Sequence, residues 1–332
     1  MHPLPRHPVA LPLCLFSLAA APAHAALLAY DGFDSTVYNA VASGSGGGYK
    51  NPSVGPSDAL FYDNDTIFEN ADGVTSFEVG QNGPVHGFSG AWRYHTNISS
   101  SVYPRLETSQ LSYGGLTPTT PGQLNLFRSF GSGATKSFSR DLNVGASSNF
   151  GSTLYIGGLI QRTSDTTFSL AFTTTDGASI RNFAMFIGAD GSATMTGENA
   201  TGVTSAAGAW GVGTPEFFVL KLENSVLDGG ASPTNGDRMS LYINPDLANE
   251  AANDAAIVIG DDNSSFFVTD NPDWSLGTMT IGSGLSAVDQ SVIFDEFKIG
   301  TEWSDMLATI PEPSSSLLLA GFLLMVCGRR KR

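Results

Sequence analysis

Short runs that alternate apolar and polar residues with a period of two recur along most of this chain. Such alternation places every second side chain on one face of a strand, and Gly, Asn, Asp and Ser between the runs favour turns. Clear alternation occurs in residues 124–130, 136–142, 167–172 and 240–243. More continuously apolar runs, which suit strands packed on a second sheet, occupy residues 154–160, 183–187, 217–222 and 292–299. We therefore predict an all-β protein, a two-sheet antiparallel β-sandwich of about ten to twelve strands.

Helical signals are few. Residues 245–252, with Pro and Asp near their start, predict one short turn of helix. Segments 41–58 and 225–237 are rich in Gly, Ser, Asn and Asp and predict long surface loops. Because strand patterns continue on both sides of each loop, we predict that residues 26–310 form a single domain, called the body below.

The first 25 residues have the order of a secretory signal. Arg6 precedes an apolar stretch over residues 9–21, and a small-x-small cleavage site ends at Ala25. We expect signal peptidase to cleave after Ala25 and the body to leave the cytoplasm.

The last 22 residues, 311–332, form a second targeting segment. Pro311, Glu312 and Pro313 come before an apolar run over residues 317–327, and the chain ends in the cations Arg329, Arg330, Lys331 and Arg332. A helix of this length rises only ~16–22 Å, less than the ~30 Å hydrocarbon core of a bilayer. The terminal cations fit the cytoplasmic side of a membrane. The sequence predicts a short hydrophobic helix that anchors the body transiently at the inner membrane.

This order of Pro-Glu-Pro, apolar helix and basic cluster resembles the PEP-CTERM sorting signal of Gram-negative bacteria. The resemblance implies that an exosortase cleaves near Pro311–Pro313. It also implies that the body then moves to the cell surface or the extracellular matrix.

A second resemblance covers nearly all of the body. The segments that show it are, in chain order, residues 28–34, 87–92, 111–116, 219–222, 241–245 and 294–300. They are similar to concanavalin-A-like (laminin-G-like) jelly-roll domains. The resemblance implies a jelly roll whose first and last strands lie together, and it implies no particular activity, since one fold hosts many functions.

Composition limits the chemistry of the body. Both cysteines, Cys14 and Cys327, lie in the targeting segments, which excludes disulfides and thiolate chemistry in the body. Without Arg6, Glu312 and the four terminal cations, 11 basic side chains remain against 30 acidic ones. Such an acidic body repels nucleic acid and anionic membrane surfaces, whereas cations and neutral glycans fit it as partners. The acidity also serves solubility.

The catalytic motifs of common hydrolases are missing from the sequence. The body has two histidines, His86 and His95, and neither a zinc-binding His-Glu-x-x-His nor a Gly-x-Ser-x-Gly sequence. Glycoside hydrolysis needs two carboxylates that face one cleft. Asp295 and Glu296 are adjacent, so in a regular strand they point to opposite faces, and Lys298 shares the face of Glu296. We therefore expect no enzymatic activity and no certain cofactor.

A structural calcium ion is one hypothesis for the acidic residues. Oxygen-rich stretches occur at residues 63–72 and 261–273, and oxygen ligands suit calcium. These stretches also fit ordinary turns. If the first and last strands adjoin, as the jelly-roll resemblance implies, Asp31 and Asp295 could share the ion.

Aromatic residues are the candidates for sugar binding. Trp92 and Tyr94 share one face of a predicted strand, with Arg93 between them, and Trp274 and Trp210 are further candidates. The alternative for each Trp is a place in the core.

The function predicted first is a non-enzymatic, exported sandwich that associates with extracellular polysaccharide. Two alternatives stay open: a hydrolase or lyase of the same fold with an unrecognised site, and a purely structural matrix protein.

Overall fold

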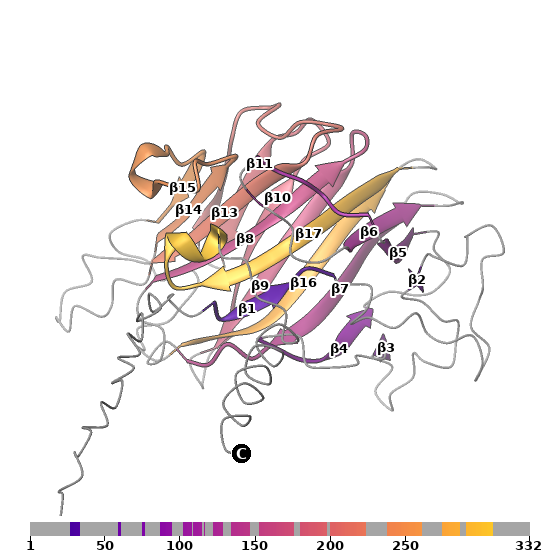
Figure 1. The fold of residues 1–332 in the computed structure, drawn as a ribbon, viewed down its shortest axis with the longest axis horizontal. Helices are drawn as coiled ribbons and strands as arrows, with labels where there is room; N and C mark the ends of the chain where they lie inside the picture. Colours follow the sequence, from indigo (N-terminus) through magenta and orange to yellow (C-terminus); the bar gives the residue numbers. More distant parts are fainter. Residues whose placement is uncertain are drawn as a thin grey trace, which may run out of the picture.

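The computed structural model arranges the chain as two antiparallel sheets packed face to face (Figure 1). The structure describes residues 27–33, 59–60, 75–76, 87–94, 102–107, 109–114, 116, 122–128, 134–146, 153–175, 180–197, 200–223, 238–260, 274–285 and 290–307. For residues 59–60, 75–76, 89–94, 102–107, 127–128, 134–136, 138 and 200–201 only the backbone is described. The predicted signal (1–25), both predicted loops and the tail (311–332) lie outside the described residues.

The first sheet has nine strands in the order β15-β14-β13-β8-β17-β6-β5-β2, and β1 pairs additionally with β17. Its strands are β1 (Ala29–Asp31), β2 (Ala59–Leu60), β5 (Val102–Glu107), β6 (Gln123–Arg128), β8 (Thr153–Arg162), β13 (Glu216–Glu223), β14 (Arg238–Ile243), β15 (Ile257–Ile259) and β17 (Ser291–Gly300).

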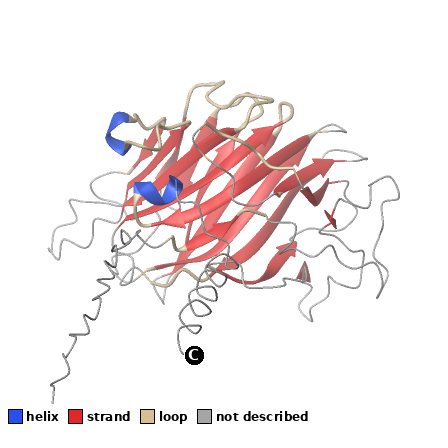
Figure 2. Ribbon diagram, in the orientation of Figure 1, coloured by secondary structure: helices blue, strands red, loops and turns tan. Residues whose placement is uncertain are grey.

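The second sheet has eight strands in the order β12-β11-β10-β9-β16-β7-β4-β3. Its strands are β3 (Thr75–Ser76), β4 (Phe88–Tyr94), β7 (Ala134–Leu142), β9 (Thr167–Thr175), β10 (Ile180–Ile187), β11 (Ala193–Gly197), β12 (Ala200–Thr204) and β16 (Ser275–Leu285). The described helices are two short 3₁₀ turns, η2 (Glu250–Ala252) and η3 (Trp303–Leu307), drawn in blue in Figure 2.

These strands confirm the predicted all-β sandwich. Each of the eight runs identified in the sequence lies in or overlaps a described strand, and the first and last described strands pair, with Tyr30 opposite Lys298. Two details of the prediction were wrong. Seventeen strands are described instead of ten to twelve, and the short helical turn predicted within 245–252 begins only at Glu250, later than the expected start near Pro245 and Asp246. Pro245 and Asp246 instead precede a turn at Leu247 and Ala248, which comes before η2.

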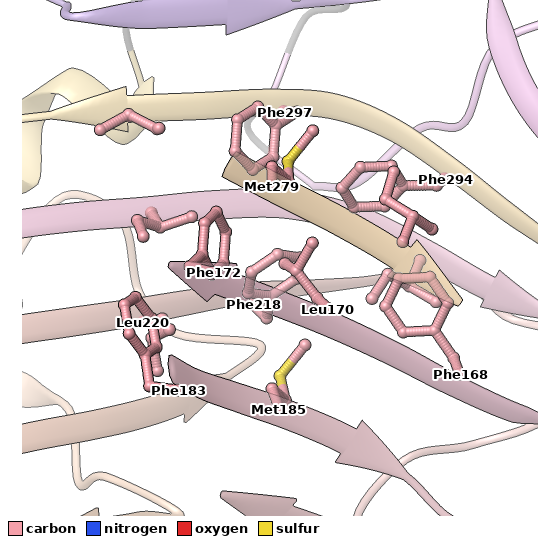
Figure 3. Close-up of a cluster of buried hydrophobic side chains, with 14 of the residues drawn as sticks. Phe168, Leu170, Phe172, Phe183, Met185, Phe218, Leu220, Met279, Phe294 and Phe297 are labelled. Carbon is pink, nitrogen blue, oxygen red and sulfur yellow. The ribbon is translucent and has the colours of Figure 1, made fainter. Parts of the chain in front are cut away.

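Alternate residues of both sheets fill one continuous core (Figure 3). Phe168, Leu170 and Phe172 of β9 point into it, and Phe183 lies on Phe172 with ring centroids 5.1 Å apart. Phe218, from the other sheet, packs against Phe294. Burial of this apolar surface is the main favourable term that holds the two sheets together.

A second, smaller cluster covers the outer face of the nine-stranded sheet. Trp303 and Met306 of η3 pack on Tyr155, Leu159 and other apolar residues of that face, and η3 lies in front of the sheet in Figure 1. Further members of the cluster are Leu111, Leu116, Phe217, Val219 and Leu247. We call this outer surface the covered face.

β17 contains a bulge that changes which side chains face the core. The pairing with β8 slips between Asp295 and Lys298, and Glu296 adopts a left-handed backbone with φ 50°. An extra residue at this point lets Phe294 and Phe297, three positions apart, both enter the core. The residues between them are consequently directed away from the core.

The loops at one end of the sandwich converge on a single buried arginine. Arg162, at the end of β8, is 1% exposed, and its guanidinium donates to the carbonyl oxygens of residues in three different loops. These acceptors are Thr166 (3.0 Å), Gly188 (2.8 Å), Ala189 (3.3 Å), Trp210 (2.7 Å) and Gly211 (3.3 Å). Gly191 allows this close approach, because a Cβ atom there would lie 2.3 Å from the Trp210 oxygen.

Candidate functional site

The aromatic residues predicted to bind sugar are distributed over different places. Trp92, Arg93 and Tyr94 lie on β4, where only the backbone is described, so their role as a platform stays a prediction. Trp274 and Trp210 are 0% and 1% exposed and belong to the main core. The prediction for these two was wrong, because a buried indole ring contributes to packing and is not accessible to a sugar.

Asp31 and Asp295 lie on adjacent strands but contact different parts of the molecule. The Asp31 carboxylate forms an ion pair of 3.3 Å with Arg140 of the opposite sheet, and it accepts the N–H of Phe33. Asp295 accepts the N–H groups of Leu111 and Glu296.

Protein donors already bond both carboxylates, and a calcium ion shared by Asp31 and Asp295 stays a prediction. Among the residues that the structure describes, no three or more His, Cys, Asp or Glu side chains gather as metal ligands would.

The bulge also corrects the expectation that Asp295 and Glu296 point to opposite faces. Asp295 bonds to Leu111, which belongs to the covered face, and Glu296 pairs at 3.4 Å with Lys298, which in turn donates to the Met306 carbonyl of η3. Both carboxylates therefore lie on the outer side of the strand. They are 0% and 1% exposed, beneath the segments that cover this face.

Burial dominates the electrostatics of this group. It raises the pKa of Asp295 to about 8. The hydrogen bond from the Leu111 N–H opposes this rise, and the neighbouring carboxylate of Glu296 adds to it. Burial likewise lowers the pKa of Lys298, and the carboxylate of Glu296 opposes that shift. Tyr30 donates its hydroxyl hydrogen to Glu296 at 3.0 Å. The group is a buried network in which these side chains bond to one another and to backbone groups.

The outer face of the eight-stranded sheet has a different character. Along β10, Phe183, Met185 and Ile187 face the core, so Ala184 and Phe186 face outward. The Phe186 side chain is 42% exposed. Its cross-strand neighbours are Ser169 on β9 and Thr194 on β11, and Thr194 is bonded to Thr204 of β12 at 2.8 Å. An aromatic ring thus stands among hydroxyl groups.

The next rows of this face are made of small and polar side chains. Ala184 lies between Ala171 and Thr196, and Asn182 lies opposite Thr173. We call the part of this surface over β9–β12 the hydroxyl face, defined by Ser169, Asn182, Phe186, Thr194, Thr196 and Thr204. Toward β7 the same sheet surface is less accessible, since Ser139 is 2% exposed.

This combination suits a flat, neutral, hydroxylated ligand. An exposed ring can cover the apolar face of a pyranose, while Ser, Thr and Asn exchange hydrogen bonds with its hydroxyls. The sequence analysis did not identify Phe186, because residues 183–187 are so apolar that the run was assigned to the core as a whole. The period-two rule applied within that run would have placed Phe186 outside.

Residues 309–332 match the PEP-CTERM protein-sorting motif, which confirms the resemblance drawn from the tail. The motif implies an exported protein that an exosortase processes at the membrane. Cleavage by signal peptidase after Ala25 stays a prediction. In the described part of the chain, no helix has the length and apolarity needed to cross a membrane.

The chain matches no curated protein. Its fold is similar to several solved structures. The VIP36 exoplasmic/lumenal domain in its Ca²⁺/Man3GlcNAc-bound form has a TM-score of 0.35 and 9% identity, over 68% of this chain and 87% of that chain. The alginate lyase vAL-1 from Chlorella virus has a TM-score of 0.37 and 10% identity, over 61% and 88%.

A Bacillus subtilis protein of unknown function with a galectin-like fold has a TM-score of 0.35 and 11% identity, over 63% of this chain and 89% of that chain. At these values the similarity assigns neither a ligand nor an activity to the present chain.

Proposed function

We propose that the body associates with extracellular polysaccharide through the hydroxyl face and does not cleave it. The observation that supports this most directly is the 42% exposed Phe186 ring between the hydroxyl-bearing residues Ser169 and Thr194. A large exposed apolar side chain that is surrounded by small polar ones has a cost in water, which a stacked sugar ring removes.

The non-catalytic part of the proposal rests on the carboxylates of β17. Asp295 and Glu296 lie side by side, but they are buried and already bonded to the Leu111 N–H, Tyr30 and Lys298. A general acid and its partner carboxylate must reach the glycosidic bond from both sides. These two residues reach only protein groups.

The proposal is tested by affinity electrophoresis of the mature protein, obtained by export of the full chain, through gels that contain neutral or acidic polysaccharides. Phe186→Ala should strongly reduce the retardation while the melting temperature stays the same. Val258→Ala, an equally exposed apolar residue (41%) on the other sheet, should leave the retardation unchanged. Equal retardation of wild type and Phe186→Ala would reject the hydroxyl face as the site. Release of reducing or unsaturated sugar ends would establish an enzyme instead.

The sorting tail supports delivery of the body to the cell surface or the matrix. Deletion of Pro311–Arg332 should leave the body unsorted, so that it fractionates differently from the full-length chain in its native host. Identical fractionation of the two forms would contradict this destination.

A structural calcium ion is proposed for the oxygen-rich segments 63–72 and 261–273, which lie outside the described residues. A ligand that binds only the folded state raises the melting temperature. Millimolar calcium should therefore raise it relative to a chelator at matched ionic strength. Coincident melting curves would remove calcium from the proposal.

A further inference from the structure

A hollow of ≈ 690 Å³ lies on the opposite side of the sandwich from the hydroxyl face. It is situated between the turn that contains η2 and the short helix η3, and its size is within the ~300–1,000 Å³ typical of ligand sites. The lining residues used below are Tyr242, Leu247, Asn249, Glu250, Trp303 and Leu307.

Aromatic side chains form one wall of the hollow. Tyr242 and Trp303 meet almost at right angles, with ring centroids 5.2 Å apart and an interplanar angle of 81°. Leu247 adds apolar surface. Such a corner offers a ring face and a ring edge to a ligand that has C–H groups on one side.

Several hydrogen-bonding groups of the hollow have no partner within the described part of the chain. The Trp303 Nε1–H is buried without an acceptor, although Trp303 as a whole is 7% exposed. The Tyr242 hydroxyl and the Asn249 side-chain amide form no hydrogen bond there either. Buried donors are normally bonded, so an unpaired one beside a hollow indicates an acceptor that the described residues do not supply.

The carboxylate wall of the hollow is held in place before any ligand arrives. Glu250 accepts the Tyr155 hydroxyl at 3.0 Å and Lys221 Nζ at 2.9 Å, and Lys221 is also paired with Glu223. Lys221 is therefore already neutralised by two carboxylates. An anionic ligand finds no available cation among these groups.

The loop at the rim is also fixed, although it is exposed. Asn253 Nδ2 donates to the carbonyl oxygens of Asp246 (2.9 Å) and Asn249 (2.8 Å), and Asn253 Oδ1 accepts the Asp246 N–H at 2.6 Å. Rigid walls of this kind reduce the ordering cost of binding.

We infer that this hollow binds one neutral sugar residue, so that the body has two saccharide sites on opposite faces. The aromatic corner of Tyr242 and Trp303 contacts the C–H groups of the sugar, and Asn249, Glu250 and the Tyr242 hydroxyl bond its hydroxyls. The second site rests on the proposed function, in that both sites take saccharides. Two sites on one rigid body can hold two polymer chains together, and such multivalent binding raises the overall avidity.

Binding to the hollow is tested with methyl glycosides of glucose, mannose and galactose, titrated into the mature protein and followed by NMR. We expect shifts at Tyr242, Asn249 and Trp303 with millimolar affinity. Tyr242→Phe removes only the hydroxyl and should weaken binding about five- to tenfold, as should Asn249→Ala. Neither should lower the melting temperature, because neither group has a hydrogen-bond partner among the described residues. Val258→Ala, an exposed residue that neither lines the hollow nor belongs to the hydroxyl face, is the matched control and should bind normally.

Bridging is tested by the turbidity of mixtures with the neutral polysaccharide that retards the protein most. Wild type should raise the turbidity, and Tyr242→Phe should be retarded in gels without raising it. The absence of shifts at the hollow overturns the inference, as does normal glycoside binding by both variants. If Phe186→Ala weakens gel retardation but keeps glycoside binding in the hollow, both statements hold. If glycosides bind in the hollow but no polysaccharide is retarded, the proposed function fails and the hollow remains a sugar site.

Discussion

The two outer faces of the sandwich have similar strands but very different coverings. On the covered face, Trp303 and Met306 of η3 seal an apolar cluster over the nine-stranded sheet. On the hydroxyl face, no apolar cluster of described residues covers Phe186 and its neighbours Ser169 and Thr194. The covered face therefore contributes to stability through buried apolar contacts, and its hollow lies beside η3. The hydroxyl face instead presents an exposed ring and hydroxyl groups to the solvent.

The largest effect should come from removing the central ring of the covered face. Trp303 contacts Tyr155 and Tyr242 edge-on and is 7% exposed. Trp303→Ala should lower the free energy of unfolding by ~3–5 kcal/mol, measured by urea denaturation. Phe186→Ala should change it by no more than ~0.5 kcal/mol, as surface substitutions do. Similar losses for both variants would show that the faces do not differ in this way.

The pH dependence of stability should also originate on the covered face. In the folded state Asp295 ionises at a pKa of about 8, whereas an unfolded Asp ionises near 3.8. The folded state therefore binds the extra proton between these values, and this contribution to stability is complete below pH ~4 and lost as the pH rises to ~8. Asp295→Asn should make the melting temperature depend less on pH over this window. It should also raise the melting temperature at pH 8 by several degrees. An unchanged pH profile in the variant would assign the dependence to other groups.

A charge placed on the hydroxyl face should change binding and leave stability intact. Thr194→Glu alters an outward position beside Phe186 and should cost less than ~0.5 kcal/mol of stability. Retardation by an acidic polysaccharide should fall more than retardation by a neutral one, and added salt should reduce that difference. Equal losses on both polymers at every salt concentration would mean that the variant acts through shape alone.

The strands of both faces were predictable, because alternation and turn residues are local signals. The pairing of β1 with β17 came from a family resemblance and is correct. The bulge at Asp295 and Glu296 was not predicted, since a left-handed φ at a glutamate leaves no local pattern. The spacing of three between Phe294 and Phe297, both in the core, was the one available signal.

The candidate sites were harder to predict for another reason. Phe186 was hidden by the apolar run around it, and Trp274 was expected at a site but lies in the core. The hollow brings Tyr242 and Glu250 close to Trp303, which lies more than fifty positions after both of them along the chain. Contacts at that distance depend on sheet order and on where η3 folds back, which periodicity does not encode.

The cluster of carbonyl oxygens around Arg162 has a consequence for the conditions in which this protein can work. Inward-pointing carbonyls attract metal ions elsewhere in proteins, but here the resident cation is a side chain. It is covalently part of the chain, so neither a chelator nor dilution can extract it. An exported protein meets media of varying ion content, and the loops between β8 and β9, β10 and β11, and β12 and β13 keep their shape without drawing an ion from the surroundings.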